Sequence, residues 1–306
     1  MGRAHRVRPA RVMDMGDLES WGFEEGDEIA PGRHALRLLG GGYRYEAYLA
    51  WEDEMLAVVV AKILRPDRVD DRSALDGMRF EATTLSVLQH PVLLRCFDAV
   101  LDGPRPHLVL EFLEGPRLST LLRRYGPLAL EQAIPLATQL ASALHYMERR
   151  GIVHLDVKPR NIIMGGPPRL IDLSVARSAA EASALDRPVG TDAYMAPEQC
   201  EPGRRGAPGP ASDVWGLGVT VHEAIAGSLP FPDPSDGERF AQLDREPEPL
   251  PEPMPPALAE LLRACLQPDP AARPSAREVA EALEPLVAAL PTRPIIGRLR
   301  PRSRRG

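Results

Sequence analysis

The sequence is short of several residue types, and each shortage excludes a class of protein. Its 306 residues contain three cysteines, an odd number at wide spacings, which fits neither a disulfide framework nor a zinc site. Reduced thiols are the simpler interpretation and favour a cytoplasmic location. The apolar run Met55–Ala61 has seven residues, whereas a membrane-spanning helix needs about 20. No apolar stretch follows the basic first twelve residues, so neither a membrane helix nor a secretory signal is expected.

Lysine is also scarce. Lys62 and Lys158 are the only two lysines among 37 basic residues. Lysine is a compact point charge, whereas arginine is a broad planar fork. Two isolated lysines are therefore unusual in this arginine-rich chain, and what they mean depends on where they lie. The bias toward arginine, alanine and proline is typical of a high-GC bacterial genome.

The charge is unevenly distributed. The formal net charge is -6, yet residues 1–12 carry four arginines and residues 291–306 carry six, without any acidic residue. The part between them is strongly acidic, which argues against a dedicated nucleic-acid-binding protein. Solvated tails are the first interpretation of the two basic ends, and contact with a membrane or a partner is the alternative.

The hydrophobic pattern predicts a strand-rich first third and a helical remainder. Short apolar or alternating runs predict strands at Ala35–Leu39, Ala47–Trp51, Met55–Leu64 and His107–Glu111. Helical spacing predicts helices at Ser73–Leu88, Leu118–Tyr125, Leu130–Arg149, Ser212–Ala226, Pro256–Cys265 and Ala276–Ala289. Two short runs, Asn161–Met164 and Pro168–Asp172, favour a small pair of strands. We therefore expect an α+β fold with two lobes.

Two segments of the strand-rich part have residues suited to phosphate. The sequence LGGGYRYEA at residues 39–47 places adjacent glycines between strands, where the backbone can approach an anion closely. A simple hairpin turn is the alternative interpretation. Lys62 ends the apolar strand that follows. It can hold phosphates if a carboxylate positions it, and a surface lysine is the alternative.

A third segment gathers acid, base and amide side chains. The sequence HLDVKPRN at residues 154–161 follows a long predicted helix. Asp156 can accept a proton from a hydroxyl, and Asn161 with Asp172 can hold Mg²⁺, because hard cations prefer oxygen ligands. Helix capping or a turn explains any one of these residues alone.

Taken in order, these segments resemble the eukaryotic-like (Hanks-type) Ser/Thr protein kinase family of bacteria over roughly residues 28–290. After the glycine loop and Lys62, Glu81 lies on the helix equivalent to αC, and Asp156 precedes Asn161 by five residues. Further family motifs stand at APE 196–198, SDVWG 212–216 and ARPS 272–275.

The resemblance implies a two-lobe kinase fold with a β-rich N-lobe, one αC helix and a mainly helical C-lobe. The implied bounds are an extension at 1–27, a kinase domain at 28–290 and an arginine-rich tail at 291–306. The domain itself is expected to consist of an N-lobe at about 28–111, a hinge at 111–115 and a C-lobe at about 116–290. The lead-in 13–27 is expected to be loose.

The resemblance also implies the chemistry: transfer of the ATP γ-phosphate, with Mg²⁺, to a serine or threonine of a protein substrate. The implied catalytic residues are Lys62, Glu81, Asp156, Lys158 and Asn161, with Asn161 and Asp172 as metal ligands. The implied nucleotide-binding residues are Leu39, Gly40, Gly42, Ala47, Ala61, Lys62, Glu111, Leu113, Ile163 and Asp172, with Leu110 as gatekeeper. Two structural roles are implied as well. Glu198 pairs with Arg273, and Asp213 braces the catalytic loop.

The sequence departs from the family pattern at three informative positions. Tyr45 replaces the third glycine of the loop, and we expect it to stiffen the loop or partly cover the phosphates. Ser174 replaces a glycine after the metal-binding aspartate, which restricts backbone freedom. Leu155 replaces the arginine that receives an activation-loop phosphate. We therefore expect control through a partner protein or through expression rather than by phosphorylation at Ser183.

Two alternatives remain at this point. A pseudokinase would bind nucleotide and act as a regulatory or scaffold module without catalysis. A small-molecule phosphotransferase would share the catalytic loop but not the APE, Gly190-Thr191 and SDVWG segments, which are expected to build a platform for a protein substrate. All six side chains that the transfer needs are present, which favours an active protein kinase.

Overall fold

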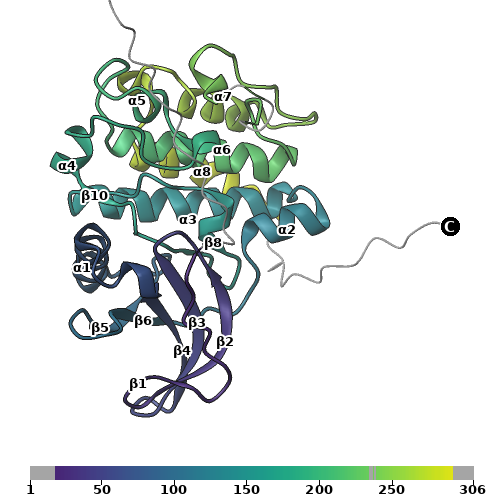
Figure 1. Ribbon diagram of the computed structural model, residues 1–306. Coiled ribbons are helices and arrows are strands. Elements are labelled where there is room, and N and C mark those ends of the chain that lie inside the picture. The colour runs from purple at the N-terminus through teal and green to yellow at the C-terminus, as the bar shows by residue number, and fades with distance from the viewer. Residues whose placement is uncertain (1–17, 234–236, 238, 292–306) are drawn as a thin grey trace, which may run out of the picture. The chain divides into compact units, whose positions relative to one another are not determined.

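A computed structural model describes residues 18–233, 237 and 239–291 (Figure 1). The described residues divide into two compact units, one formed by 18–82 with 96–112, the other by 83–95 with those from 113 to 291. The passage from Phe112 to Leu113 falls within the predicted hinge. The predicted tails at 1–17 and 292–306 lie outside the described residues.

The first unit contains a six-stranded antiparallel sheet in the order β1-β2-β3-β4-β6-β5 (Figure 1). Its strands are β1 (Glu28–Ala30), β2 (Arg33–Gly41), β3 (Tyr45–Glu52), β4 (Ala57–Leu64), β5 (Cys96–Val100) and β6 (His107–Glu111). The alternation of β3 buries one set of its side chains, among them Tyr48 and Ala50. These join residues of the neighbouring strands in one core: Ile29, Ala35, Val59, Ala61, Ile63 and Val109.

Three details of this sheet differ from the sequence prediction. β1 and β5 were not predicted, because one is three residues long and the other leaves Phe97 and Asp98 exposed. β4 begins at Ala57 rather than Met55, because Leu56 has a φ of 49° and belongs to the preceding turn. The apolar run alone could not separate turn from strand.

The lead-in before β1 is ordered along residues 18–27, contrary to the expectation of a loose segment. The Trp21 indole nitrogen donates to the Leu64 carbonyl at 2.7 Å, and its backbone N–H donates to Glu46 at 3.0 Å. Its ring stacks on Phe23, which meets Tyr48 edge-on. The described part of the lead-in therefore covers the sheet core.

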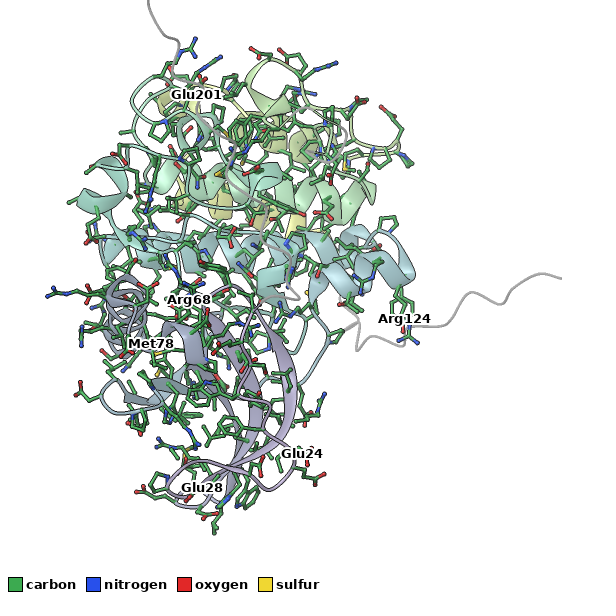
Figure 2. All side chains as sticks on the ribbon, viewed as in Figure 1. Glu24, Glu28, Arg68, Met78, Arg124 and Glu201 are labelled. Carbon is green, nitrogen blue, oxygen red and sulfur yellow. The ribbon has the colours of Figure 1, made fainter. Side chains whose placement is uncertain are left out.

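One helix, α1 (Arg72–Val87), crosses the boundary between the two units in sequence. The carboxylate of Asp71 accepts the N–H groups of Ser73 and Ala74 and so caps its first turn. Its apolar stripe buries Met78 and Ala74, and Figure 2 labels Met78 on this helix. The prediction of a helix at Ser73–Leu88 is confirmed to within one residue at each end.

The second unit is mainly helical. Its helices are α2 (Leu118–Tyr125), α3 (Leu130–Arg149), α4 (Ala179–Ser183), α5 (Pro197–Cys200), α6 (Pro210–Ala226), α7 (Pro256–Cys265) and α8 (Ala276–Ala288). α6 is apolar on nearly all sides and is almost wholly buried, and α3 packs against α6 and α8 (Figure 1). Two small antiparallel pairs complete the unit: β7 (Ile152–Val153) with β10 (Arg177–Ser178), and β8 (Ile162–Ile163) with β9 (Arg169–Leu170).

The architecture confirms the predicted α+β class, with a β-rich unit and a mainly helical unit. α2, α3 and α7 have the predicted bounds. Within the described part of the chain, every helix is too short or too polar to span a membrane.

Candidate active site

The strand β4 carries Lys62 next to a carboxylate of α1. Its ammonium donates to both oxygens of Glu81, at 2.8 and 2.7 Å. The Glu81 side chain is 1% exposed and the Lys62 side chain 12%. Two short, charge-assisted contacts at these burial levels fix the ammonium at one place. The predicted pair is therefore present in the sheet unit.

Tyr45 has a different place from the one expected. Its side chain is buried, its ring lies 4.7 Å from the Lys62 ammonium, and its hydroxyl donates to the Ala74 carbonyl of α1 at 3.4 Å. A ring that faces Lys62 and α1 from inside the unit does not cover the glycine turn. It adds a cation–π contact to the ammonium instead.

The glycine segment forms the hairpin between β2 and β3. A side chain at Gly41 would come within 2.6 Å of the Tyr45 carbonyl, so this position requires glycine. The Gly42 N–H donates to the same carbonyl at 2.9 Å, and the Gly42 carbonyl accepts from Arg65. Gly40 has a φ of 136° and nothing within 4 Å of an added Cβ. The hairpin interpretation is thus correct, and any contact with phosphate remains a prediction.

Other predicted nucleotide-binding residues have apolar or backbone groups to offer. In the sheet unit, Ala61 is fully buried, Ala47 is half-buried and Leu39 is exposed on β2. Glu111 ends β6. In the helical unit, Leu113 and Ile163 are half-buried. The gatekeeper position, Leu110, is buried among the strands of the sheet.

The loop after β7 contributes three side chains to a network of four, and Thr191 is the fourth. Lys158 donates from its ammonium to Asp156 at 2.7 Å and to the Thr191 hydroxyl at 2.5 Å, and that hydroxyl donates to the other Asp156 oxygen at 2.7 Å. Asn161 donates from its amide to the same carboxylate at 3.0 Å. The Asp156 side chain keeps an exposed fraction of 11%. Donors from three residues orient this carboxylate, and Thr191 is the member that sequence reasoning had placed only in the substrate platform.

The predicted metal ligands lie at neighbouring ends of the β8–β9 pair. Asn161 comes just before β8 and Asp172 two residues after Leu170 in β9, and the Ile171 N–H donates to the Asn161 carbonyl at 2.9 Å. Because the Asn161 amide nitrogen turns to Asp156, its side-chain oxygen turns elsewhere. Asp172 has a φ of 70°, and its Oδ1 accepts the Ser174 N–H at 3.3 Å. An amide oxygen and a carboxylate fit a hard divalent cation.

The base of the catalytic loop rests on a buried carboxylate. Asp213 accepts the N–H groups of His154 and Leu155, each at 2.7 Å, which confirms the predicted brace. Burial raises the pKa of Asp213 to about 7, although the two N–H donors act to lower it. Burial also lowers the pKa of His154. Leu155 has a φ of 64°, an unfavourable conformation for a branched residue. The brace, with the bond from the Gln199 amide to the Leu155 carbonyl, holds it there.

Leu155 belongs to an apolar cluster, which we call the activation-segment cluster. Leu155, Val153 and Ala182 are buried, and Leu185 and Val189 pack against them. Three of these residues come from the segment between Asp172 and Glu198. From the sequence, position 155 was notable only for the absence of arginine. The local sequence does not indicate which apolar residues of the later segment contact Leu155 in the fold. The side chain in fact anchors the activation segment by apolar contact.

The segment's end is held by a second buried carboxylate. Glu198 makes a bidentate pair with Arg273 at 2.7 and 2.8 Å, both side chains being 0% exposed. Ser212 donates to the same carboxylate at 2.6 Å, and the guanidinium lies over the Trp215 ring. The predicted pair is confirmed, and its closed surroundings make it structural.

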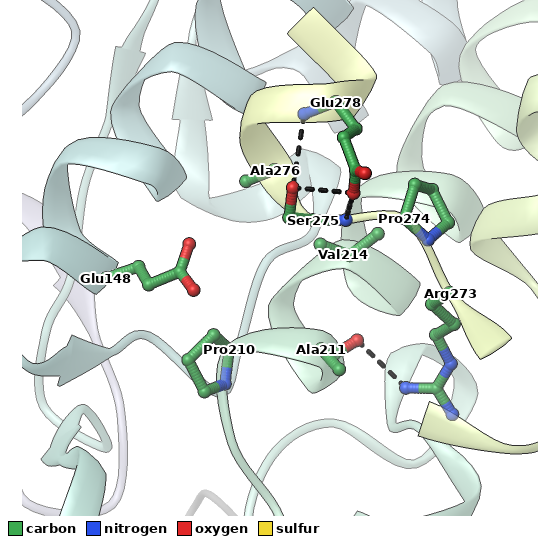
Figure 3. Close-up of a pocket in the computed structure, with 9 residues that line it drawn as sticks. All are labelled: Glu148, Pro210, Ala211, Val214, Arg273, Pro274, Ser275, Ala276 and Glu278. Carbon is green, nitrogen blue, oxygen red and sulfur yellow. Dashed lines mark hydrogen bonds between the residues drawn. The ribbon is translucent and has the colours of Figure 1, made fainter. Parts of the chain in front are cut away.

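A pocket of about 360 Å³ lies elsewhere in the helical unit, between the end of α3 and the starts of α6 and α8 (Figure 3). Several polar groups of its wall are bonded within the fold. Arg273 donates to the Ala211 carbonyl, while Ser275 and Glu278 cap α8 reciprocally (Figure 3). None of the predicted site residues lines this pocket, so it is not the catalytic site.

The three cysteines have no disulfide partner. Burial raises the pKa of Cys96 to about 11 and the pKa values of Cys200 and Cys265 to about 12. All three are therefore protonated thiols at neutral pH, and none is an activated nucleophile. Among the described residues, no group of three or more His, Cys, Asp or Glu side chains is arranged to hold a metal.

Comparison with known proteins agrees with this geometry. The protein kinase domain family matches residues 33–283. Serine/threonine-protein kinase PknA of Mycobacterium tuberculosis is 32% identical over 255 residues, covering 79% of this chain and 58% of PknA. Serine/threonine-protein kinase PkaA of Streptomyces coelicolor is 36% identical over 235 residues, covering 74% of this chain and 42% of PkaA. The rice CBL-interacting protein kinase 11 is 29% identical over 255 residues, covering 81% of this chain and 50% of that kinase. The chain thus spans about half the length of these relatives.

Proposed function

The chain belongs to the protein kinase family, and we propose that it is a serine/threonine kinase that transfers the γ-phosphate of ATP to a protein hydroxyl. The observation that carries the proposal is the oriented carboxylate of Asp156, held by Lys158, Thr191 and Asn161. Phosphoryl transfer to an alcohol needs a carboxylate that is positioned to accept the hydroxyl proton and a cation beside it for the charge on the transferred group.

We assign each residue one task. Asp156 accepts the proton of the substrate hydroxyl, and Lys158 stabilises the charge on the group being transferred. Lys62, fixed by Glu81, holds the α- and β-phosphates. Bound ATP with Mg²⁺ supplies the phosphoryl group. Asn161 and Asp172 hold the metal through oxygen atoms.

The adenine site is assigned to apolar side chains and backbone groups. Leu39, Ala47 and Ala61 of the sheet unit and Ile163 of the helical unit provide apolar contact. Gly40 and Gly42 allow close approach of the backbone to the phosphates, and Glu111 and Leu113 offer backbone hydrogen bonds. The apolar character of these four side chains and the open space around Gly40 support the assignment.

The geometry favours an active kinase over a pseudokinase. Lys62 has its carboxylate partner and Asp156 has its donors. Tyr45 supports Lys62 rather than obstructing the glycine turn. Leu155, which stands where the family has arginine, packs in the activation-segment cluster. None of the three departures from the family pattern removes a group that the transfer needs.

We propose residues 28–290 as the minimal kinase domain, extended to about residue 18 because Trp21 and Phe23 cover the sheet. We also propose control through a partner protein or through expression, because Leu155 is packed in an apolar cluster and offers no charge to a phosphate on the activation segment. Protonated, unpaired thiols and the need for ATP favour action in the cytoplasm.

The test is phosphate transfer by the purified chain with labelled ATP and Mg²⁺. Asp156→Asn should abolish incorporation into Ser or Thr while keeping the thermal shift caused by nucleotide, because it removes only the proton acceptor. Asp102→Asn, at an exposed loop position of the sheet unit, is the matched control and should keep full activity. If the wild-type chain binds nucleotide but transfers no more phosphate than Asp156→Asn, the pseudokinase alternative is correct.

A further inference from the structure

Two arginines of the helical unit lie together beside the catalytic loop. Arg160 is the middle residue of the 3₁₀ turn Pro159–Asn161, one position before Asn161. Arg117 immediately precedes α2, and its guanidinium donates to the Arg160 carbonyl at 3.2 Å. The Arg117 backbone also bridges to Ile163. These contacts fix Arg117 against the segment that follows Asp156.

Local stability does not explain the choice of arginine at 117. The residue that precedes a helix is preferably Ser, Thr, Asp or Asn, whose side chain accepts an N–H of the first turn. Arg117 makes no such capping bond, and a cation is unfavourable at the positive end of the helix dipole. A residue that costs stability at its own position is more readily explained by binding.

The two guanidinium groups are not neutralised within the described part of the chain. Neither forms an ion pair there, whereas Lys158 of the same loop is paired with Asp156. Burial and the charge of Arg160 lower the pKa of Arg117, against the opposing charge of Asp172. Two guanidinium groups that meet at one turn make the surroundings electropositive, although Asp172 moderates them.

We propose that Arg117 and Arg160 form a specificity site that selects protein substrates carrying aspartate or glutamate within a few residues of the accepting serine or threonine. The inference rests on the proposed kinase activity. Arginine forks match carboxylates in bidentate geometry, and Arg160 is exposed within four positions of Asp156. A basic substrate residue at the same place would meet two like charges, which is disfavoured.

The experiment compares peptides that differ only in the residues flanking one serine: acidic, amide or lysine. We expect kcat/KM for the acidic peptide to exceed that for the amide peptide by about tenfold or more, and the lysine peptide to be poorest. The double variant Arg117→Glu, Arg160→Glu should reverse the order of the acidic and lysine peptides, with KM for ATP changed by less than about threefold. Arg263→Glu, an exposed arginine on α7, is the matched control and should keep the wild-type order.

Equal use of the three peptides by the wild-type enzyme would overturn the proposal. So would a double variant that loses affinity for ATP while keeping the preference for acid, because the two arginines would then serve the nucleotide. The wild-type comparison does not depend on the folding of any variant, and Arg117→Gln with Arg160→Gln provides a milder second test, expected to abolish the preference. Failure of the proposed function itself looks different, since no peptide would then be phosphorylated.

Discussion

Two buried ion pairs of this protein have similar bond lengths and different surroundings. Arg273 and Glu198 meet at 2.7 and 2.8 Å with both side chains 0% exposed. Lys62 and Glu81 meet at 2.8 and 2.7 Å, but Lys62 keeps an exposed fraction of 12%. The first pair is closed on all sides, and the second leaves one side of its cation accessible.

The difference shows how cation type follows from task. The planar guanidinium of Arg273 reaches Glu198 with two nitrogens and backbone carbonyls with the same group, and its face lies over Trp215. All the guanidinium N–H groups of Arg273 are used within the fold, which suits a purely structural role. Lys62 is a compact point charge, and part of its side chain stays exposed. In a chain with 35 arginines and two lysines, the open pair is the one that has lysine.

The largest effect is expected at the closed pair. Glu198→Gln leaves the Arg273 charge buried without its counter-charge, which typically costs about 3–5 kcal/mol. We expect a large fall in the urea midpoint and in the yield of soluble protein. Glu201→Gln, on a partly exposed acid paired with Arg204, is the control and should change stability by less than about 1 kcal/mol. A loss at Glu198 no larger than at Glu201 would contradict the structural role.

A smaller effect, on rate rather than stability, is expected at the open pair. Lys62→Arg conserves the charge but cannot place it at the same point, so phosphate transfer should fall at least about tenfold, equivalent to about 1.4 kcal/mol of transition-state stabilisation. The urea midpoint should change little. Arg37→Lys, an exposed exchange on β2 of the same sheet, should leave the rate unchanged. Full activity of Lys62→Arg would mean that cation shape does not matter there.

The least effect is expected from removing the activation-segment hydroxyl most open to phosphorylation. Ser183 ends α4 and is exposed, its hydroxyl donating only to the Ala180 carbonyl. Since Leu155 offers no charge to a phosphate, Ser183→Ala and phosphatase treatment should each change the rate on an exogenous substrate by less than about twofold. Ser178, by contrast, caps α4. A tenfold loss in either experiment would show that another cation receives a phosphate.

The sequence predicted local features better than long-range ones. The periodicity of Leu130–Arg149 was sufficient for α3, and the motif order was sufficient for the pairs Lys62–Glu81 and Glu198–Arg273. β1 is too short to carry a pattern, and β5 has exposed Phe97 where alternation would place polar residues. The hydroxyl of Thr191 reaches Asp156 across 35 positions. Such distant contacts follow from packing, which local spacing does not contain.

The activation-segment cluster has a consequence for how the protein responds to its solution. A segment held by a phosphate on an arginine is loosened by salt, because ions screen the attraction. Contacts among Leu155, Ala182, Leu185 and Val189 carry no charge, so ionic strength alone should not release them. Apolar association weakens on cooling and is reinforced by excluded salts such as sulfate. The ordered segment should therefore tolerate high salinity and loosen first in the cold.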